Sequence, residues 1–427
     1  HLDRVSLLAS RDPAILGSIA ASLTAREEHA EALSCYQRLL RHRPGDLQAN
    51  LSVAYSARYA GDFELAEQCL QQLISRHPRF YQAYFALTQL GPASADHHHT
   101  EELESALRSS GGDTSARAFL GYGLGKEYED IGENKRAFEH YQAGARAQRE
   151  LYPRPPREAE IARKVISAFP GDMPANESSA GEGLIFVVGL PRSGSTLVDR
   201  MLGAHSRVRN GGELRAFPFC AHRQLGLQPA DVMSPQLLSD LDKLDSRALG
   251  SDYLDCLPTN WLRDGVLTDK NPLNYLYVGL IRKALPAAKI LHIYRNPMDA
   301  CFSSYKQLFA PGAYLHIYNL EDIAQHYADY TALMAYWRDL YPESLVELSY
   351  ESLVADTEPE LRRVLASLGL DWEEGVLGFH RRKAGVGTAS FAQVRQPVYA
   401  GSVERWRLFA EPLQPLAKAL EVAGVKL

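Results

Sequence analysis

The sequence predicts an α + α/β protein: a helical-repeat domain followed by a domain built on a mainly parallel sheet. Three observations carry this prediction. Residues 13–151 repeat with a period of 34, and residues 184–427 alternate short apolar runs with helical stretches. Leu184 to Thr196 reads as a strand, a tight turn between two glycines and the start of a helix, which is the layout of a phosphate-binding loop.

The N-terminal repeat is visible as identical residues 34 positions apart, namely Ala32 and Ala66, Pro44 and Pro78, Cys35 and Cys69, Leu39 and Leu73, and Ala49 and Ala83. This period, with small residues at helix crossings and a closing proline, is typical of tetratricopeptide repeats (TPR). We expect repeats at 13–46, 47–80 and about 118–151, with an irregular helix pair at 81–117. Stacked together they would form an α-solenoid over residues 1–151.

Residues 152–183 are predicted to hold a helix at 158–169 and then a linker rich in Gly, Pro, Ser and Asn. In the remaining domain, 184–427, we expect strands at 184–188, 266–268, 289–294 and 345–348. The expected helices are 196–203, 274–285, 298–309, 321–340, 357–369 and 412–423. Such alternation gives a parallel sheet with helices on both faces and ligand loops at the carboxyl ends of its strands.

Composition excludes several classes of protein. The chain has 427 residues, 45% of them apolar, which suits a globular protein of two or three domains. A net charge of −6 argues against a nucleic-acid or anionic-membrane binder, and no apolar run approaches the ~20 residues of a membrane helix. Five scattered cysteines without a CxxC motif indicate free thiols in the cytoplasm and no zinc site. The start at His1, without Met or a signal pattern, leaves open a trimmed targeting segment.

Two segments are candidates for anion binding. The loop after the first strand keeps the glycine spacing of a P-loop, but Ser195 stands where the lysine of a Mg-nucleotide site is required. Arg192 lies inside this loop, so an anion held by a guanidinium and hydroxyls fits better. Farther along, Arg295 at a strand end and Ser303, eight positions later (303 − 295 = 8), are placed to converge on a second anion. Each residue alone has an ordinary interpretation as a surface or helix residue, whereas both motifs in order favour function.

Pro191 to Thr196 resembles the 5′-phosphosulfate loop of sulfotransferases that use 3′-phosphoadenosine 5′-phosphosulfate (PAPS), and Arg295 with Ser303 resembles their 3′-phosphate site. The resemblance covers residues 184–427 and implies a P-loop-type α/β domain with PAPS as co-substrate and no metal. Its implied PAPS-binding residues are Arg192, Ser193, Gly194, Ser195, Thr196, Arg295, Ser303, Tyr350 and Arg405. For Tyr350 a plain core position is the alternative.

The segment Gly211-Gly212-Glu213-Leu214-Arg215 is similar to one in tyrosylprotein sulfotransferases, and bacterial sulfotransferases with a TPR extension form a recognisable group. The resemblance implies in-line transfer of a sulfuryl group to a hydroxyl acceptor, a peptide tyrosine or a carbohydrate or other alcohol. Its implied catalytic residues are Glu213 as general base, Arg192, Lys270 and Ser390. Pro272 stands where cytosolic small-molecule enzymes carry a histidine base, which gives Glu213 more weight. A solvated carboxylate and a surface lysine are the alternatives for Glu213 and Lys270.

The acceptor and the partners stay open at this point. Arg215 matches an arginine that reads acidic peptides in the tyrosylprotein enzymes, but Phe219 replaces another. The TPR groove is expected to hold a protein or peptide acceptor or to mediate self-association as a homo-oligomer, or else to shield the catalytic domain. The alternative function is a nucleotide-sensing TPR scaffold with a non-catalytic domain. A metal at His97, His98 and His99 is disfavoured because consecutive side chains point in different directions.

Overall fold

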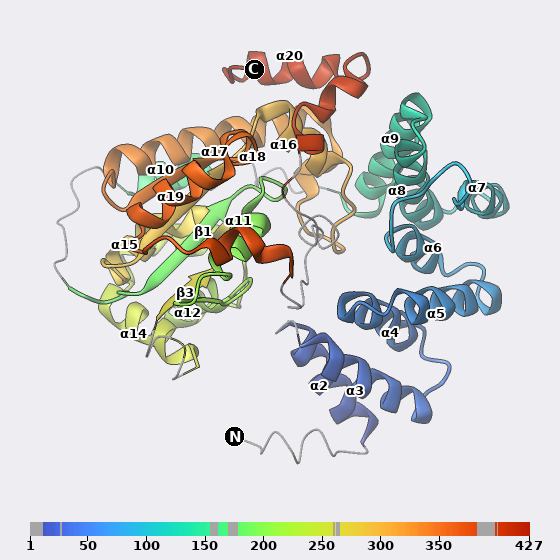
Figure 1. Cartoon of the computed structure of the whole chain (residues 1–427), viewed down its shortest axis with the longest axis horizontal. Helices are drawn as coiled ribbons and strands as arrows, with labels where there is room; N and C mark the ends of the chain where they lie inside the picture. The colour runs from blue at the N-terminus through green and yellow to red at the C-terminus, as the bar shows by residue number, and fades with distance from the viewer. Residues whose placement is uncertain are drawn as a thin grey trace. The chain divides into compact units, whose positions relative to one another are not determined.

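The computed structural model describes residues 12–25, 28–153, 161–169, 178–258, 261, 265–381, 398 and 400–427. These residues divide into two compact units, drawn with their element labels in Figure 1. The first unit combines the described residues up to Pro153 with residues 305–319, and the second contains the other described residues.

The first unit is helical. Its helices are α2 (Pro13–Ala25), α3 (His29–His42), α4 (Leu47–Ala60), α5 (Phe63–Arg76), α6 (Tyr81–Thr88), α7 (Thr100–Ser109), α8 (Thr114–Asp130) and α9 (Asn134–Leu151). Helix pairs therefore fill the expected repeats at 13–46 and 47–80, and α6 and α7 form the irregular pair. The third pair begins at Thr114 rather than near Ala118, because the Asp113 carboxylate caps the backbone N–H groups of Ser115 and Ala116 at 2.7 and 3.1 Å.

Small residues set the helix spacing in this unit. Ala32, Ala66 and Ala137 are fully buried, as expected for helix crossings. Helices α8 and α9 approach so closely that a Cβ on Gly121 would lie 3.0 Å from Gly144 Cα, a distance that leaves no room for a larger residue. The helical N-terminal region is thus confirmed, and its assignment as tetratricopeptide repeats stays a prediction.

Residues 305–319, which include the 3₁₀ helix η4 (Leu315–Tyr318), pack on α8 and α9 within this unit. The Tyr122 hydroxyl donates to the Tyr305 carbonyl at 3.0 Å, and the Tyr318 ring lies edge-on to Tyr122. The Lys306 ammonium contacts both carboxylate oxygens of Glu129 at 2.6 and 2.9 Å. Helix α16 therefore ends at Tyr305 and not at 309 as expected, because the chain leaves it to join the helical unit.

The second unit contains a five-stranded parallel sheet with the order β2-β3-β1-β4-β5. Its strands are β1 (Leu184–Gly189), β2 (Val208–Asn210), β3 (Val266–Asp269), β4 (Lys289–Tyr294) and β5 (Leu345–Ser349). The four expected strands are confirmed to within a residue or two. The edge strand β2 was missed because it has three residues and one apolar side chain, too short for a hydrophobic pattern.

Helices surround this sheet (Figure 1). They are α10 (Ile161–Ala168), α11 (Ser195–Leu202), α12 (Ala216–Gln224), α13 (Pro235–Ser239), α14 (Ser246–Cys256), α15 (Val278–Ala284), α16 (Pro297–Tyr305), α17 (Leu320–Leu340), α18 (Tyr350–Ala355), α19 (Thr357–Ser367) and α20 (Gln414–Val422). The short 3₁₀ helices are η2 (Leu241–Lys243), η3 (Pro272–Tyr277), η5 (Glu374–Arg381), η7 (Ala400–Ser402) and η8 (Arg405–Phe409). The helix expected at 274–285 is thus a 3₁₀ turn followed by α15.

Alternate residues of the strands face two different cores. Ile185 and Val187 of β1 pack in a cluster with α11, α18 and α19. Phe186, between them in sequence, packs edge-on against Phe217 of α12 and at a tilt against Tyr253 of α14 on the opposite face. The sheet is therefore covered on both sides, which explains why the central strand β1 is apolar from Leu184 to Val188. No helix among the described residues combines the length and apolarity needed to cross a bilayer.

Candidate active site

The strand order places the predicted site residues along one edge of the sheet. Parallel strands end at the same edge, and a candidate residue follows each of the five within a few positions. Read across the sheet from β2 to β5, these residues are Glu213, Lys270, Arg192, Arg295 and Tyr350. The proposed base and lysine thus follow β2 and β3, the anion-binding residues follow β4 and β5, and the phosphate-binding loop lies between them.

The loop between β1 and α11 has a backbone shaped for an anion. Arg192 has φ of 68° and Gly194 has φ of 101°, so two of its residues adopt the left-handed region. A non-glycine residue held there is strained and is found preferentially at functional sites. At Gly194 a Cβ would lie 2.4 Å from the Tyr350 ring, so a larger residue would displace that ring from the loop.

Ser193 is buried in this loop, and its hydroxyl finds no hydrogen-bond partner among the described residues. A buried hydroxyl without a partner costs about 1–3 kcal/mol, which a bound ligand oxygen would recover. Ser195 and Thr196, the first two residues of α11, are also buried. Three hydroxyl residues therefore line the strand–helix junction where backbone N–H groups favour an anion.

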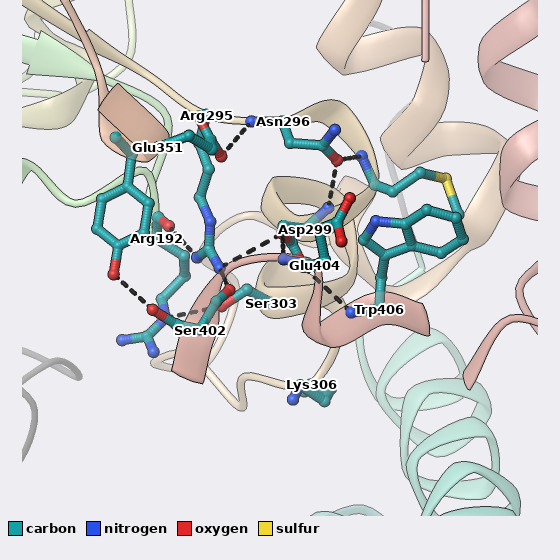
Figure 2. A network of polar contacts seen from close by, with 12 residues as sticks. Arg192, Arg295, Asn296, Asp299, Ser303, Lys306, Glu351, Ser402, Glu404 and Trp406 are labelled. Atoms are coloured by element: carbon teal, nitrogen blue, oxygen red, sulfur yellow. Dashed lines mark hydrogen bonds and ion pairs between the residues drawn. The ribbon is translucent and has the colours of Figure 1, made fainter. Parts of the chain in front are cut away.

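Arg295 ties the two anion motifs together (Figure 2). Its guanidinium donates to the Arg192 carbonyl at 3.1 Å and to the Ser402 carbonyl, and it lies 4.8 Å from the centre of the Tyr350 ring. The Nε atom of Arg295 is buried without a partner in the described part of the chain. Arg192 Nε in turn donates to Ser303 Oγ at 3.3 Å. Arg192 thus meets Arg295 and Ser303, which lie 103 and 111 positions later in the sequence.

Helix α16 anchors the C-terminal segment beside this cluster. The Asn296 side chain caps α16 through the N–H groups of Met298 and Asp299. The buried Asp299 carboxylate accepts from the N–H groups of Glu404 at 2.7 Å and Trp406 at 3.1 Å. Figure 2 shows these contacts next to Arg295, whose guanidinium lies 4.0 Å from the Asp299 carboxylate.

Arg405 lies on the segment that Asp299 fixes, between Glu404 and Trp406, at the start of η8. On the same segment, the Ser402 hydroxyl is 2.5 Å from the Tyr350 hydroxyl. Tyr350 and the segment that carries Arg405 thus lie beside the anion residues, while Ser402 and Asp299 were missed from the sequence. Ser390 lies outside the described residues.

Glu213 and Lys270 form an ion pair, with Oε1 and Nζ 2.5 Å apart. The turn that precedes Glu213 depends on two glycines, because Gly212 has φ of 72° and a Cβ on Gly211 would lie 2.5 Å from the Thr268 carbonyl. The Lys270 side chain is 2% exposed and that of Glu213 is 50% exposed. The pair therefore presents a carboxylate to solvent while the ammonium is enclosed.

Buried polar groups behind the pair fix the ends of β2 and β3. Asp199 of α11 accepts hydrogen bonds from the Thr268 hydroxyl at 2.5 Å and the Asn210 amide at 2.9 Å. Asp269 accepts from the Tyr253 hydroxyl at 2.9 Å, and burial raises the pKa of its carboxyl to about 8. Burial likewise raises the pKa of Asp199. The sequence alone hardly indicates this network, since polar residues are common where a strand passes into a loop.

Arg215, the candidate reader of an acidic peptide, forms a two-point ion pair with Asp231, and its guanidinium lies 4.9 Å from the centre of the Phe219 ring. The guanidinium is thus already matched by a carboxylate of the same unit. A peptide carboxylate would have to compete with Asp231 for it.

Comparison with known proteins shows what the second unit is similar to. A model described as the sulfotransferase family matches residues 185–374. An uncharacterised protein of Aquifex aeolicus (strain VF5) is 28% identical over 417 residues, which are 95% of this chain and 54% of that protein. Protein-tyrosine sulfotransferase A of Caenorhabditis elegans is 25% identical over 238 residues, 52% of this chain and 60% of that protein.

Among solved structures, the sulfotransferase domain of the Synechococcus PCC 7002 olefin synthase is 21% identical, with a TM-score of 0.42, and covers 60% of this chain and 99% of that chain. The chain spans 54% and 60% of the lengths of the two relatives above. The family match contains β1 to β5 and the residues at their carboxyl ends, from Arg192 to Tyr350. Residues 185–374 are therefore similar to the sulfotransferase family.

Proposed function

We propose that this chain is a PAPS-dependent O-sulfotransferase. The observation that carries the proposal is the pairing, along one sheet edge, of an anion site around Arg192 and Arg295 with the Glu213–Lys270 ion pair. A donor anion and an acceptor hydroxyl could be held side by side there, as group transfer requires.

The residues present fit PAPS as the donor. Two buried polar atoms without a partner among the described residues, Ser193 Oγ and Arg295 Nε, are the kind of donors that phosphate or sulfate oxygens satisfy. Ser195 in place of the P-loop lysine disfavours a Mg-nucleotide. Arg192 and the hydroxyl residues of the loop would hold the phosphosulfate, and Arg295 with Ser303 the 3′-phosphate.

The reaction would proceed by in-line displacement. The acceptor oxygen forms a bond to sulfur while the bond from sulfur to the bridging oxygen of PAPS breaks. The acceptor proton passes to the Glu213 carboxylate, and the electron pair leaves with 3′-phosphoadenosine 5′-phosphate. Lys270 is placed beside Glu213 and would offset the negative charge that develops on the bridging oxygen.

The acceptor is a hydroxyl of a peptide tyrosine, a carbohydrate or another alcohol. The Arg215 guanidinium is already paired with the Asp231 carboxylate. This residue therefore gives no reason to prefer an acidic peptide over the other acceptors. We propose that the helical repeats, as TPRs, recruit a protein or peptide acceptor or mediate self-association. The five cysteines without a CxxC motif accord with a cytoplasmic enzyme.

The alternative function is a nucleotide-sensing scaffold. It is supported by the anion site itself, which would serve a sensor equally well. The Glu213–Lys270 pair favours the enzyme, because nucleotide sensing gives no reason to expose a carboxylate on a two-glycine turn at the same edge.

Titration calorimetry with 3′-phosphoadenosine 5′-phosphate and with Mg-ATP tests the donor assignment. We expect saturable binding of the bisphosphate and none of Mg-ATP. Tight Mg-ATP binding without a response to the bisphosphate would overturn it. A second assay distinguishes the enzyme from the sensor. It measures transfer of ³⁵S from labelled PAPS to a panel of tyrosine peptides, sugars and simple phenols.

A further inference from the structure

A cluster of metal-binding side chains lies in the helical unit, among residues that the proposed reaction does not use. Glu67 comes from α5, and His97 and His99 come from the loop that precedes α7. One ligand atom of each lies within 4.8 Å of the others. Two imidazoles and a carboxylate are a donor set suited to Zn²⁺ and similar divalent transition metals.

The backbone turn before α7 brings the two histidines to one side. Ser94 and His97 exchange two backbone hydrogen bonds, at 2.9 and 3.1 Å, which close a tight turn. The His97 and His99 rings then lie 5.5 Å apart, edge to face. His98, between them, turns to the Thr100 hydroxyl at 2.9 Å. Consecutive side chains point in different directions, as expected, but His97 and His99, two positions apart, lie on the same side.

Glu127 of α8 supports His99 from behind. Its carboxylate lies 3.4 Å from His99 Nδ1 and accepts the backbone N–H of His99 at 2.9 Å. A carboxylate on one ring nitrogen orients the imidazole and leaves the other nitrogen for a metal, which is the usual outer shell of a metal-binding histidine. The carboxylates of Glu127, Glu102 and Glu67 all act on His99 electrostatically, so their negative charges favour a cation at this place.

We propose that Glu67, His97 and His99 bind a divalent transition metal of the zinc type, with Glu127 as the positioning residue. A tetrahedral zinc ion holds its ligand atoms ~3.4 Å apart, as bonds of about 2.0–2.1 Å require. The exposed His97 ring can close the remaining distance by rotating about its side-chain bonds. Three protein ligands leave the fourth position for water. The ion would tie the loop before α7 to α5 and, through Glu127, to α8.

The test uses the untagged full chain, stripped of metal with a chelator and titrated with Zn²⁺ against a chromophoric competitor. We expect one equivalent to bind, and Co²⁺ to give visible absorption bands of a low-coordinate site. His97→Ala and His99→Ala should each weaken binding about tenfold or more, and Glu127→Gln by about 10–100-fold. Zinc should raise the melting temperature of the wild type and not that of His99→Ala.

His98→Ala is the matched control, because it removes a neighbouring imidazole that points to Thr100. It should leave the zinc affinity unchanged. His97 is exposed, so its variant is expected to fold. Absence of saturable zinc binding by the wild type, or equal loss in His98→Ala and His97→Ala, would overturn the proposal. Since the readouts are binding and melting, their outcome is independent of sulfotransferase activity.

Discussion

At the scale of single residues, the two partners of the Glu213–Lys270 pair differ in environment. Lys270 is enclosed, with 2% of its side chain exposed, whereas half of Glu213 faces solvent. Removing the carboxylate would leave an ammonium buried without its counter-ion, which is costly, so a neutral isostere is the informative change. The glutamine amide keeps the volume and one oxygen that can accept from Lys270.

Glu213→Gln is expected to retain nucleotide affinity and to lose turnover by about a hundredfold or more, the scale of general-base loss. The check is the rate at saturating PAPS together with the dissociation constant of the bisphosphate. Glu411→Gln, at an exposed carboxylate near α20, serves as the control with a normal rate. A near-normal rate in Glu213→Gln would remove this residue from the mechanism.

Arg295→Ala should act on binding. Its guanidinium is buried at the anion cluster, and a charge-assisted hydrogen bond contributes about 1.5–3 kcal/mol. We expect the dissociation constant of 3′-phosphoadenosine 5′-phosphate to rise about tenfold or more. Arg247→Ala, at an exposed arginine on α14, controls for loss of charge. An unchanged constant in Arg295→Ala would exclude Arg295 from the 3′-phosphate site.

Asp269 makes stability depend on pH. Burial raises the pKa of its carboxyl from 3.8 to about 8, so the folded chain keeps a proton that the unfolded chain releases. The unfolded state binds fewer protons between these values, and the contribution of Asp269 to stability therefore falls as pH rises from about 4 to 8, by on the order of 1 kcal/mol per pH unit.

Urea unfolding of wild type and Asp269→Asn from pH 5 to 8 measures this contribution. The variant should gain stability relative to the wild type as pH rises, since an amide does not titrate. A constant difference across the range would mean that Asp269 titrates alike in both states.

At the scale of elements, the sequence was informative where the signal is local. Five apolar residues at 184–188 predict a buried strand because burial on both faces requires apolar side chains at every position. The glycine spacing after it predicts the loop, because few other residues adopt its backbone angles. The helix pairs at 13–80 followed from small residues recurring at a fixed period.

The pattern failed where a residue acts on a partner far along the chain. Nothing near Asp299 shows that its carboxylate holds the N–H groups of Glu404 and Trp406, which lie 105 and 107 positions later. Ser402 was missed for the same reason. An aspartate in the first turn of a helix is ordinarily explained by the helix dipole. The local sequence therefore does not indicate that its carboxylate also binds a distant segment.

Asp299→Ala should therefore loosen the segment 402–406. Because Arg295 and Arg405 lose support, the affinity for the bisphosphate should fall several-fold. Asp299→Asn, which keeps one acceptor oxygen, should show a smaller effect. Calorimetry gives the affinity, and amide hydrogen exchange in 402–406 reports the loosening. Unchanged exchange in Asp299→Ala would show that the segment is held by other contacts.

At the scale of the whole molecule, the two units do not simply follow one another along the chain. Residues 305–319 follow the helix that carries Ser303, yet they fold with the helical unit. Acceptor recruitment by the repeats can be tested by comparing the fragment 180–427 with the full chain. If the fragment has the same KM for the acceptor as the full chain, recruitment is excluded. If the fragment is insoluble, there are two possible causes: the loss of shielding by the helical unit, and the loss of the partners of Tyr318 and Lys306 within that unit.

The Glu129–Lys306 ion pair separates these two causes within the intact chain. Glu129 is 6% exposed and Lys306 17%, so the pair is largely buried, and Tyr141 also donates to Glu129 at 3.0 Å. Glu129→Gln removes the negative charge that faces the Lys306 ammonium and should lower the free energy of unfolding by about 3 kcal/mol. Adding Lys306→Met removes the ammonium as well and should restore most of that loss.

Urea unfolding of the wild type, both single variants and the double variant gives the coupling energy of the pair. If the segment 305–319 needs the helical unit for its fold, the coupling is large and the double variant regains stability. Additive effects would show that the segment is held by other contacts, such as Tyr122 with Tyr305. In that case an insoluble 180–427 fragment would indicate that the repeats shield the catalytic domain.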